Sequence, residues 1–204
     1  ETSKATSSSA GYRVEGTGWM AGPYAEMRFG AYIFADVKAL WGQSSNDISP
    51  FLTYTDTFET GRWLASARVK GLWTWSNWRF TPSAQIIGFS DVSDDYVDSL
   101  GVSIPGQGVT IGRAIFGPEL AYRYVTPDKW FIEPKLAIKG ISTFSQDGAA
   151  GAVGLDPFRA RLEGGLRIEG PDGTRFELQG AYDGISDDNL DAVSGKASVT
   201  VPLN

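Results

Sequence analysis

Residues 158–169 read FRARLEGGLRIE, and apolar or small side chains alternate with charged ones along almost all of this stretch. Side chains of a β-strand point alternately to its two faces, so this pattern predicts a strand with one apolar face and one charged face. Residues 63–73, WLASARVKGLW, repeat the alternation. A bilayer-spanning barrel turns the apolar face of each strand to lipid and the charged face to a wet lumen.

The composition excludes several classes of function. The chain has 204 residues with neither Cys nor His, and 13% of them are aromatic. Without these two residue types a disulfide, thiol chemistry and a Ser-His-Asp triad are impossible. A net charge of −6 disfavours a nucleic-acid partner. We therefore predict one non-enzymatic domain with no catalytic residues, no metal site and no cofactor.

The connections between the predicted strands alternate in length. The nine predicted strands are residues 17–29, 31–42, 62–74, 78–90, 109–125, 129–144, 158–170, 174–185 and 193–203. Tight turns alternate with longer links at 43–61, 91–108, 145–157 and 186–192. Short periplasmic turns and long surface loops are typical of outer-membrane barrels. We expect residues 1–16 to be a flexible tail or surface-loop remnant and residues 17–204 to form the barrel.

This reasoning predicts an all-β, transmembrane, antiparallel up-and-down β-barrel of the bacterial outer membrane. Two aromatic girdles are expected, with Trp19, Trp41 and Trp63 at the long-loop ends and Trp73, Trp78 and Trp130 at the short-turn ends. The charged side chains expected to face the lumen, where acids and bases would pair, are Glu26, Arg28, Asp36, Lys38, Arg68, Lys70, Arg113, Glu119, Arg123, Glu133, Lys135, Lys139, Arg159, Arg161, Glu163, Arg167, Glu169, Arg175, Glu177 and Asp183.

Two other features of the sequence need an interpretation. Prolines fall within predicted strands on the apolar face, where we expect bulges or positions near the membrane interface: Pro23, Pro82, Pro118 and Pro134. Two loops are rich in oxygen ligands: Asp91, Asp94 and Asp95, and Asp187, Asp188, Asn189 and Asp191. They lack the regular ligand spacing of a calcium loop, so we interpret them as acidic surface loops.

Four short motifs carry a family resemblance. They are GWMAGPY at 18–24, GRWLASA at 61–67, IPGQ at 104–107 and FGPELAYR at 116–123. From about residue 17 to 204 the chain resembles the translocator barrels of autotransporters (type V secretion), especially alphaproteobacterial ones. The resemblance implies an outer-membrane barrel that carries a passenger to the cell surface. It also implies a lipid and lipopolysaccharide environment, and barrel-insertion machinery as a partner.

The strand count leads to a further expectation. The resemblance implies a twelve-stranded barrel, of which this chain would be the C-terminal portion. Nine strands cannot close a wholly antiparallel ring, so we expect strands from an upstream segment or another chain to lie between the first and the ninth. Two alternatives remain: a small free-standing outer-membrane barrel acting as a passive pore or anchor, and a soluble lipocalin-like ligand-binding barrel with its apolar face inside.

Overall fold

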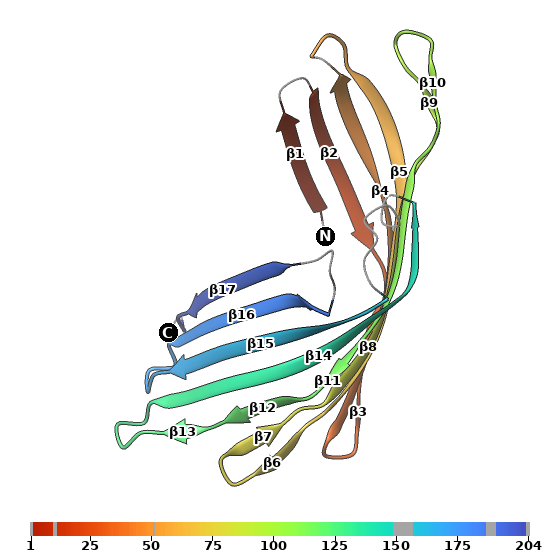
Figure 1. The fold of residues 1–204 in the computed structure, drawn as a ribbon. Coiled ribbons are helices and arrows are strands. Elements are labelled where there is room, and N and C mark those ends of the chain that lie inside the picture. The colour runs from red at the N-terminus through yellow and green to blue at the C-terminus, as the bar shows by residue number, and fades with distance from the viewer. Residues whose placement is uncertain (1, 10–11, 51, 149–156, 187–190, 203–204) are drawn as a thin grey trace.

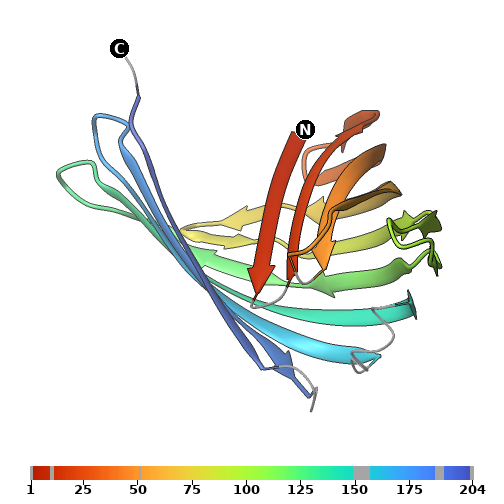
Figure 2. The same ribbon diagram turned by 90° about the horizontal axis from the view of Figure 1, so that it is seen from above.

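A computed structural model shows one large, strongly curved antiparallel sheet and one small separate hairpin (Figure 1). The structure describes all residues except 1, 10–11, 51, 149–156, 187–190 and 203–204. Every regular element among the described residues is a strand, which confirms the predicted all-β antiparallel class. Viewed from above, the sheet curves into an open trough, with β1 and β17 as its edge strands (Figure 2).

Several strands of the sheet are short pieces separated by one or two residues. The strands are β1 (Thr2–Ser9), β2 (Tyr12–Ala21), β3 (Tyr24–Phe29), β4 (Ile33–Pro50), β5 (Asp56–Gly71), β6 (Trp73–Trp75), β7 (Trp78–Phe80), β8 (Ser83–Ser93), β9 (Tyr96–Val97), β10 (Ser103–Ile104), β11 (Gly108–Gly117), β12 (Glu119–Tyr122), β13 (Tyr124–Val125), β14 (Phe131–Gly148), β15 (Phe158–Glu169), β16 (Arg175–Ile185) and β17 (Ala192–Thr200).

These pieces combine into spans that run the length of the sheet. The spans, in order, are β1, β2–β3, β4, β5–β6, β7–β8, β11–β13, β14, β15, β16 and β17, and each pairs antiparallel with its sequence neighbour. The nine predicted strands correspond to the spans from β2–β3 to β17. Because consecutive spans are neighbours, the sheet has the predicted up-and-down order.

The N-terminal segment differs from its expected form. Part of the stretch 1–16, for which we expect a flexible tail or surface-loop remnant, forms β1, which pairs with β2 from Thr2↔Trp19 to Ser9↔Tyr12. The segment is rich in Ser and Thr and shows no apolar alternation. It pairs only with the part of β2 between Trp19 and the long-loop end, where backbone hydrogen bonds need no apolar band. Side-chain periodicity therefore could not reveal this strand.

The link predicted at residues 43–61 is mostly strand as well. The β4–β5 ladder continues without a break from Ile33↔Gly71 to Ile48↔Asp56. Its outer part carries polar side chains on both faces, so the alternation that marks a strand disappears there. Polar side chains bond across the two strands instead, as between Ser44 Oγ and Thr60 Oγ1 at 2.6 Å. The link at 91–108 likewise contains the β9–β10 hairpin.

Three of the four in-strand prolines explain the breaks between strand pieces. Pro23, Pro82 and Pro118 lie between β2 and β3, β7 and β8, and β11 and β12. Their carbonyls still accept backbone hydrogen bonds from neighbouring strands, Pro82 from Gly71 at 2.9 Å. The missing proline N–H therefore interrupts the ladder without separating the strands, as expected for an irregularity at these positions.

Candidate functional site: the charged face of the sheet

Burial on the two faces of the sheet is the inverse of that in a water-soluble protein. On β14, Leu136 and Ile138 are 55% and 56% exposed, whereas Glu133 and Ala137 on the other face are 2% and 4% exposed. Among the described residues, the fully buried hydrophobic side chains are Ala121, Ala137 and Ile141, and all three lie on the charged face. Large apolar side chains thus gather on the open face, and charges gather on the sheltered one.

The exposed apolar surface spans most of the sheet. Val69 on β5, Ile86 on β8, Leu178 on β16 and Val199 on β17 are all exposed. A soluble monomer rarely leaves a continuous apolar area of this extent in water. A lipocalin-like barrel would place these side chains inside, so that alternative is wrong.

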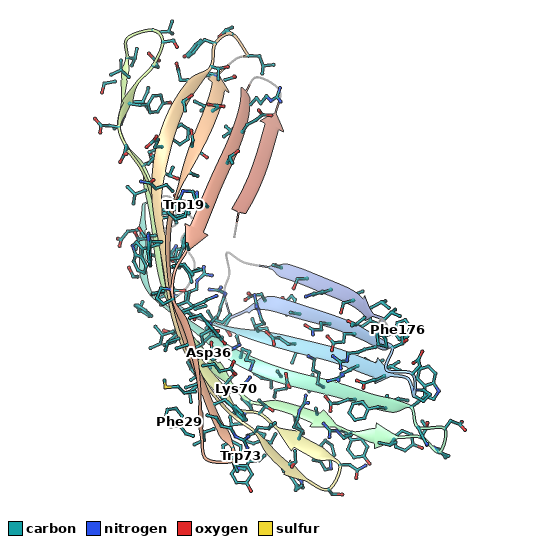
Figure 3. All side chains as sticks on the ribbon, turned by 180° about the vertical axis from the view of Figure 1, so that it is seen from behind. Trp19, Phe29, Asp36, Lys70, Trp73 and Phe176 are labelled. Carbon is teal, nitrogen blue, oxygen red and sulfur yellow. The ribbon has the colours of Figure 1, made fainter. Side chains whose placement is uncertain are left out.

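Aromatic side chains mark two levels along the strands. Trp41 and Trp63 are direct cross-strand partners, and Trp73 and Trp78 lie beside the short turn at Ser76–Asn77. Trp19 and Trp73 lie at different heights on the sheet in Figure 3. Ten residues separate Trp63 from Trp73, which is about 25 Å across a bilayer at ~3.3 Å per residue and ~40° tilt. That height equals the apolar band of an outer-membrane barrel.

The aromatic cluster at the short-turn ends includes residues that the sequence analysis did not select. Trp78 and Tyr122 meet edge to face with ring centroids 4.9 Å apart. Trp75 lies 6.4 Å from Phe80 and is half exposed. Trp75 lies between the predicted strands 62–74 and 78–90, but in the structure it is the last residue of β6 and pairs with Trp78. The two girdles themselves stay a prediction.

The strand register places the predicted charged set on one face of the sheet. One cross-strand row joins Glu26, Asp36 and Arg68, and another joins Glu133, Arg167 and Glu177. Residues that are directly opposite in a ladder share a face. In Figure 3 Asp36 and Lys70 lie on the neighbouring strands β4 and β5.

Glu133 is the most buried acid on this face and the centre of an ion-pair group. Its carboxylate lies 2.9 Å from Arg79 Nη2 and 3.4 Å from Arg123 Nε, and Arg79 also lies 3.4 Å from Glu119. Arg79 is not in the predicted set, although it belongs to the predicted strand 78–90. Its position between the outward Trp78 and Phe80 was the available signal. The group ties the spans β7–β8, β11–β13 and β14 together.

Other acids on the charged face are also paired with arginines. Arg68 Nε donates to Asp36 at 2.7 Å, and Arg175 Nε donates to Glu169 at 3.1 Å. Asp183 accepts from Arg159 Nε at 2.9 Å and also from Arg161. The expected pairing of acids with bases is thus present for most of the acids.

The bases are not all matched. Twelve members of the predicted set are bases and eight are acids, although the whole chain has more acids than bases. Lys70 lies over the ring of Phe34, and Lys139 bonds Ser83 Oγ at 3.0 Å. Within the described residues, no acid lies in ion-pair range of the bases Arg28, Lys38, Lys70, Arg113, Lys135 and Lys139. The charged face therefore carries a surplus of positive charge.

The described residues contain neither a cluster suited to a metal ion nor a helix suited to crossing a bilayer. The part of the chain that the structure describes contains no group of three or more potential metal-binding side chains. Asp91 lies 3.1 Å from Arg62 Nη2, and residues 187–189 of the second acidic loop lie outside the described part. No helix among the described residues has the length and apolarity to cross a bilayer.

Comparison with known proteins identifies the family. The model of the autotransporter β-domain matches residues 1–192. The chain belongs to the autotransporter β-domain family. A β-domain of this kind anchors in the bacterial outer membrane and exports the passenger in type V secretion, and it is not an enzyme. The family, function and location implied by the resemblance are thus confirmed.

The fold is similar to that of a solved β-domain. The crystal structure of the β-domain of the Bordetella autotransporter BrkA matches with a TM-score of 0.58 and 16% sequence identity. The match covers 96% of this chain and 84% of that chain. At this identity the likeness concerns the fold alone. A search of curated proteins gave no match to the chain.

Proposed function

We propose that the charged face of this β-domain lines the lumen through which the passenger passes, and that the apolar face contacts lipid and lipopolysaccharide. The inverted burial on β14 carries this proposal, since Glu133 is sheltered while its neighbours Leu136 and Ile138 are exposed. An exported polypeptide is polar along its backbone, and a wet, charged wall lets it pass without losing hydration. Hydrocarbon outside the barrel covers the apolar face without removing water from charged side chains.

We infer further that additional strands complete the barrel between β1–β3 and β17. Among the described residues, β3 pairs only with β4, and β17 pairs only with β16. Strand edges inside hydrocarbon leave backbone N–H and C=O groups unsatisfied, which costs several kcal/mol per group. An upstream segment of the same polypeptide could supply these strands without a second chain. This chain would then be the C-terminal portion of a twelve-stranded, alphaproteobacterial-type translocator that depends on the barrel-insertion machinery.

Cysteine labelling tests the assignment of the two faces. Leu178 and Gln179 are adjacent and exposed on opposite faces of β16, and the chain contains no Cys. In full-length protein in outer membranes, a membrane-impermeant maleimide should label Gln179→Cys and leave Leu178→Cys unlabelled. Water is needed to form the reactive thiolate, and hydrocarbon excludes it. Equal labelling of the two variants would refute the assignment.

The same variants test translocation. A passenger that carries a folded, disulfide-bonded domain should stop inside the barrel if that domain is wider than the lumen. The stalled chain should protect Gln179→Cys from the maleimide, and reduction of the disulfide should restore labelling. Unchanged labelling during the stall would show that the passenger does not pass along this face.

A further inference from the structure

Six buried side-chain atoms among the described residues have no hydrogen-bond partner, and three of them belong to neighbouring residues of the charged face. Arg113 on β11 is the direct cross-strand partner of Thr143 on β14, and Arg159 on β15 is paired with Ile141, the preceding residue on the same face of β14. We call Arg113, Thr143 and Arg159 the arginine corner. Its unpartnered atoms are Arg113 Nε, Thr143 Oγ1 and Arg159 Nη1.

Each unpartnered atom is costly. A buried donor that has lost water and gained no partner costs about 1–3 kcal/mol, and more when it is charged. Arg159 is only 3% exposed, and its Nε is already used by Asp183. Three such atoms on adjacent strands therefore indicate a group that supplies acceptors to this place.

The local charge indicates the sign of that group. Three arginines, Arg113, Arg159 and Arg161, lie on neighbouring strands in this part of the charged face, and Asp183 is the cross-strand partner of Arg161. Asp183 is shared by Arg159 and Arg161, and no acid among the described residues forms an ion pair with Arg113. A guanidinium presents parallel N–H groups that match a carboxylate or phosphate. The missing group is an anion of that shape.

A row of apolar side chains lies beside the corner on the same face. Leu40, Leu64, Phe89 and Ile111 are successive cross-strand partners on β4, β5, β8 and β11. All four are half-buried. Ile111 is the residue before Arg113 on this face of β11, about 7 Å away along the strand. A free inorganic anion would not use this row, whereas a polypeptide can present a carboxylate and an apolar side chain at that spacing.

We propose that the arginine corner holds an Asp or Glu side chain of the polypeptide segment that occupies the lumen, with an apolar side chain of that segment against the row from Leu40 to Ile111. The bound carboxylate accepts from Arg113 Nε, Arg159 Nη1 and Thr143 Oγ1. This inference rests on the proposed function, because it needs a polypeptide in the lumen. It adds the chemistry of the segment and the residues that hold it.

The probe is a photoreactive benzoylphenylalanine at Ile87, which is the cross-strand partner of Arg113 on β8. Full-length protein is irradiated in outer membranes, and mass spectrometry identifies the crosslinked peptide. We expect a peptide from the same polypeptide upstream of the β-domain, with an Asp or Glu close in sequence to the crosslinked residue. A peptide without an acid, a crosslink to residues 149–156 or 187–190, or no crosslink would overturn the proposal.

Charge variants make the test quantitative. Arg113→Gln and Arg113→Glu should lower the crosslink yield about tenfold or more, since one charge-assisted hydrogen bond corresponds to a factor of this size. Arg113→Lys should retain part of the yield. Lys38→Gln is the matched control, because it removes one positive charge from the same cross-strand row, three strands away from Arg113, at a base that forms no ion pair among the described residues. Equal yields in Arg113→Gln and Lys38→Gln would also overturn the proposal.

Protease accessibility of the passenger separates this inference from the proposed function. A passenger that never reaches the surface in the unmodified protein would contradict the proposed function. Normal surface exposure together with any of the overturning results at the corner would contradict only the carboxylate site.

Discussion

A charge placed on the exposed apolar face should destabilise the β-domain by an amount that depends on depth. Leu136 lies on β14, six residues after Trp130, which directly precedes this strand, and this corresponds to about 15 Å above the predicted short-turn girdle at ~3.3 Å per residue and ~40° tilt. This position is near the middle of an apolar band about 25 Å tall. Leu136→Arg should therefore cost about 2–4 kcal/mol in the free energy of unfolding.

The assay is urea unfolding of full-length protein reconstituted in lipid vesicles, followed by tryptophan fluorescence and heat-modifiable gel mobility. Gln179→Arg is the matched control, because Gln179 lies on the charged face in the same cross-strand row as Lys135, the neighbour of Leu136. It should change the free energy by less than about 1 kcal/mol. Leu136→Phe, which keeps the site apolar, should also be mild. Equal losses in Leu136→Arg and Gln179→Arg would refute the assignment of the faces.

Three further predictions concern single contacts. Glu133→Gln leaves Arg79 and Arg123 without their shared carboxylate. It should lower the free energy of urea unfolding by about 3–5 kcal/mol. The control Glu163→Gln changes a partly exposed ion pair 3.8 Å long and should lower it by less than about 1 kcal/mol. Gly173 has φ +84° in the turn after β15, so Gly173→Ala should cost about 1 kcal/mol or more, while Gly164→Ala, which meets open space, should be neutral by the same measurement. The backbone N–H of Thr174, and then its hydroxyl, lower the pKa of Asp172. This stabilisation of the turn is present above the unfolded pKa and is lost as the pH falls through the lowered folded value. The protection factor of the Thr174 amide, which is its exchange rate relative to the intrinsic rate at the same pH, should therefore fall in acid, and Asp172→Asn should abolish this pH dependence.

The faces of the strands could be predicted from sequence because a period of two is a local property. Lys135 and Leu136 point to opposite sides whichever strand lies next to β14, so the lipid-side and charged-side sets needed no knowledge of pairing. The long β4–β5 ladder and β1 could not be predicted, because their polar side chains remove the alternation while the backbone keeps its hydrogen bonds.

Contacts between distant residues depend on register, which the local pattern does not contain. Glu133 meets Arg79 only because β12 lies between β7 and β14. The arginine corner depends in addition on the irregularity between Gly112 and Arg113, which shifts β11 by one residue relative to β14. Without that shift Arg113 would face a different partner from Thr143. A sequence pattern identifies which face carries Arg113 but not which atoms surround it.

The whole-chain charge is a poor guide to the charge of the proposed lumen. The chain has 18 bases and 24 acids, and the predicted lumen set takes twelve of the bases but eight of the acids. The rest of the chain keeps six bases and sixteen acids, and many of these acids lie at the long-loop ends: Asp47, Asp56, Glu59, Asp91, Asp94, Asp95 and Asp98. A basic wall beneath an acidic rim attracts acidic side chains inside the barrel and repels them at its mouth. This distribution of charge agrees with the proposal that an acidic side chain is held at the arginine corner, which is part of the wall, and not at the rim.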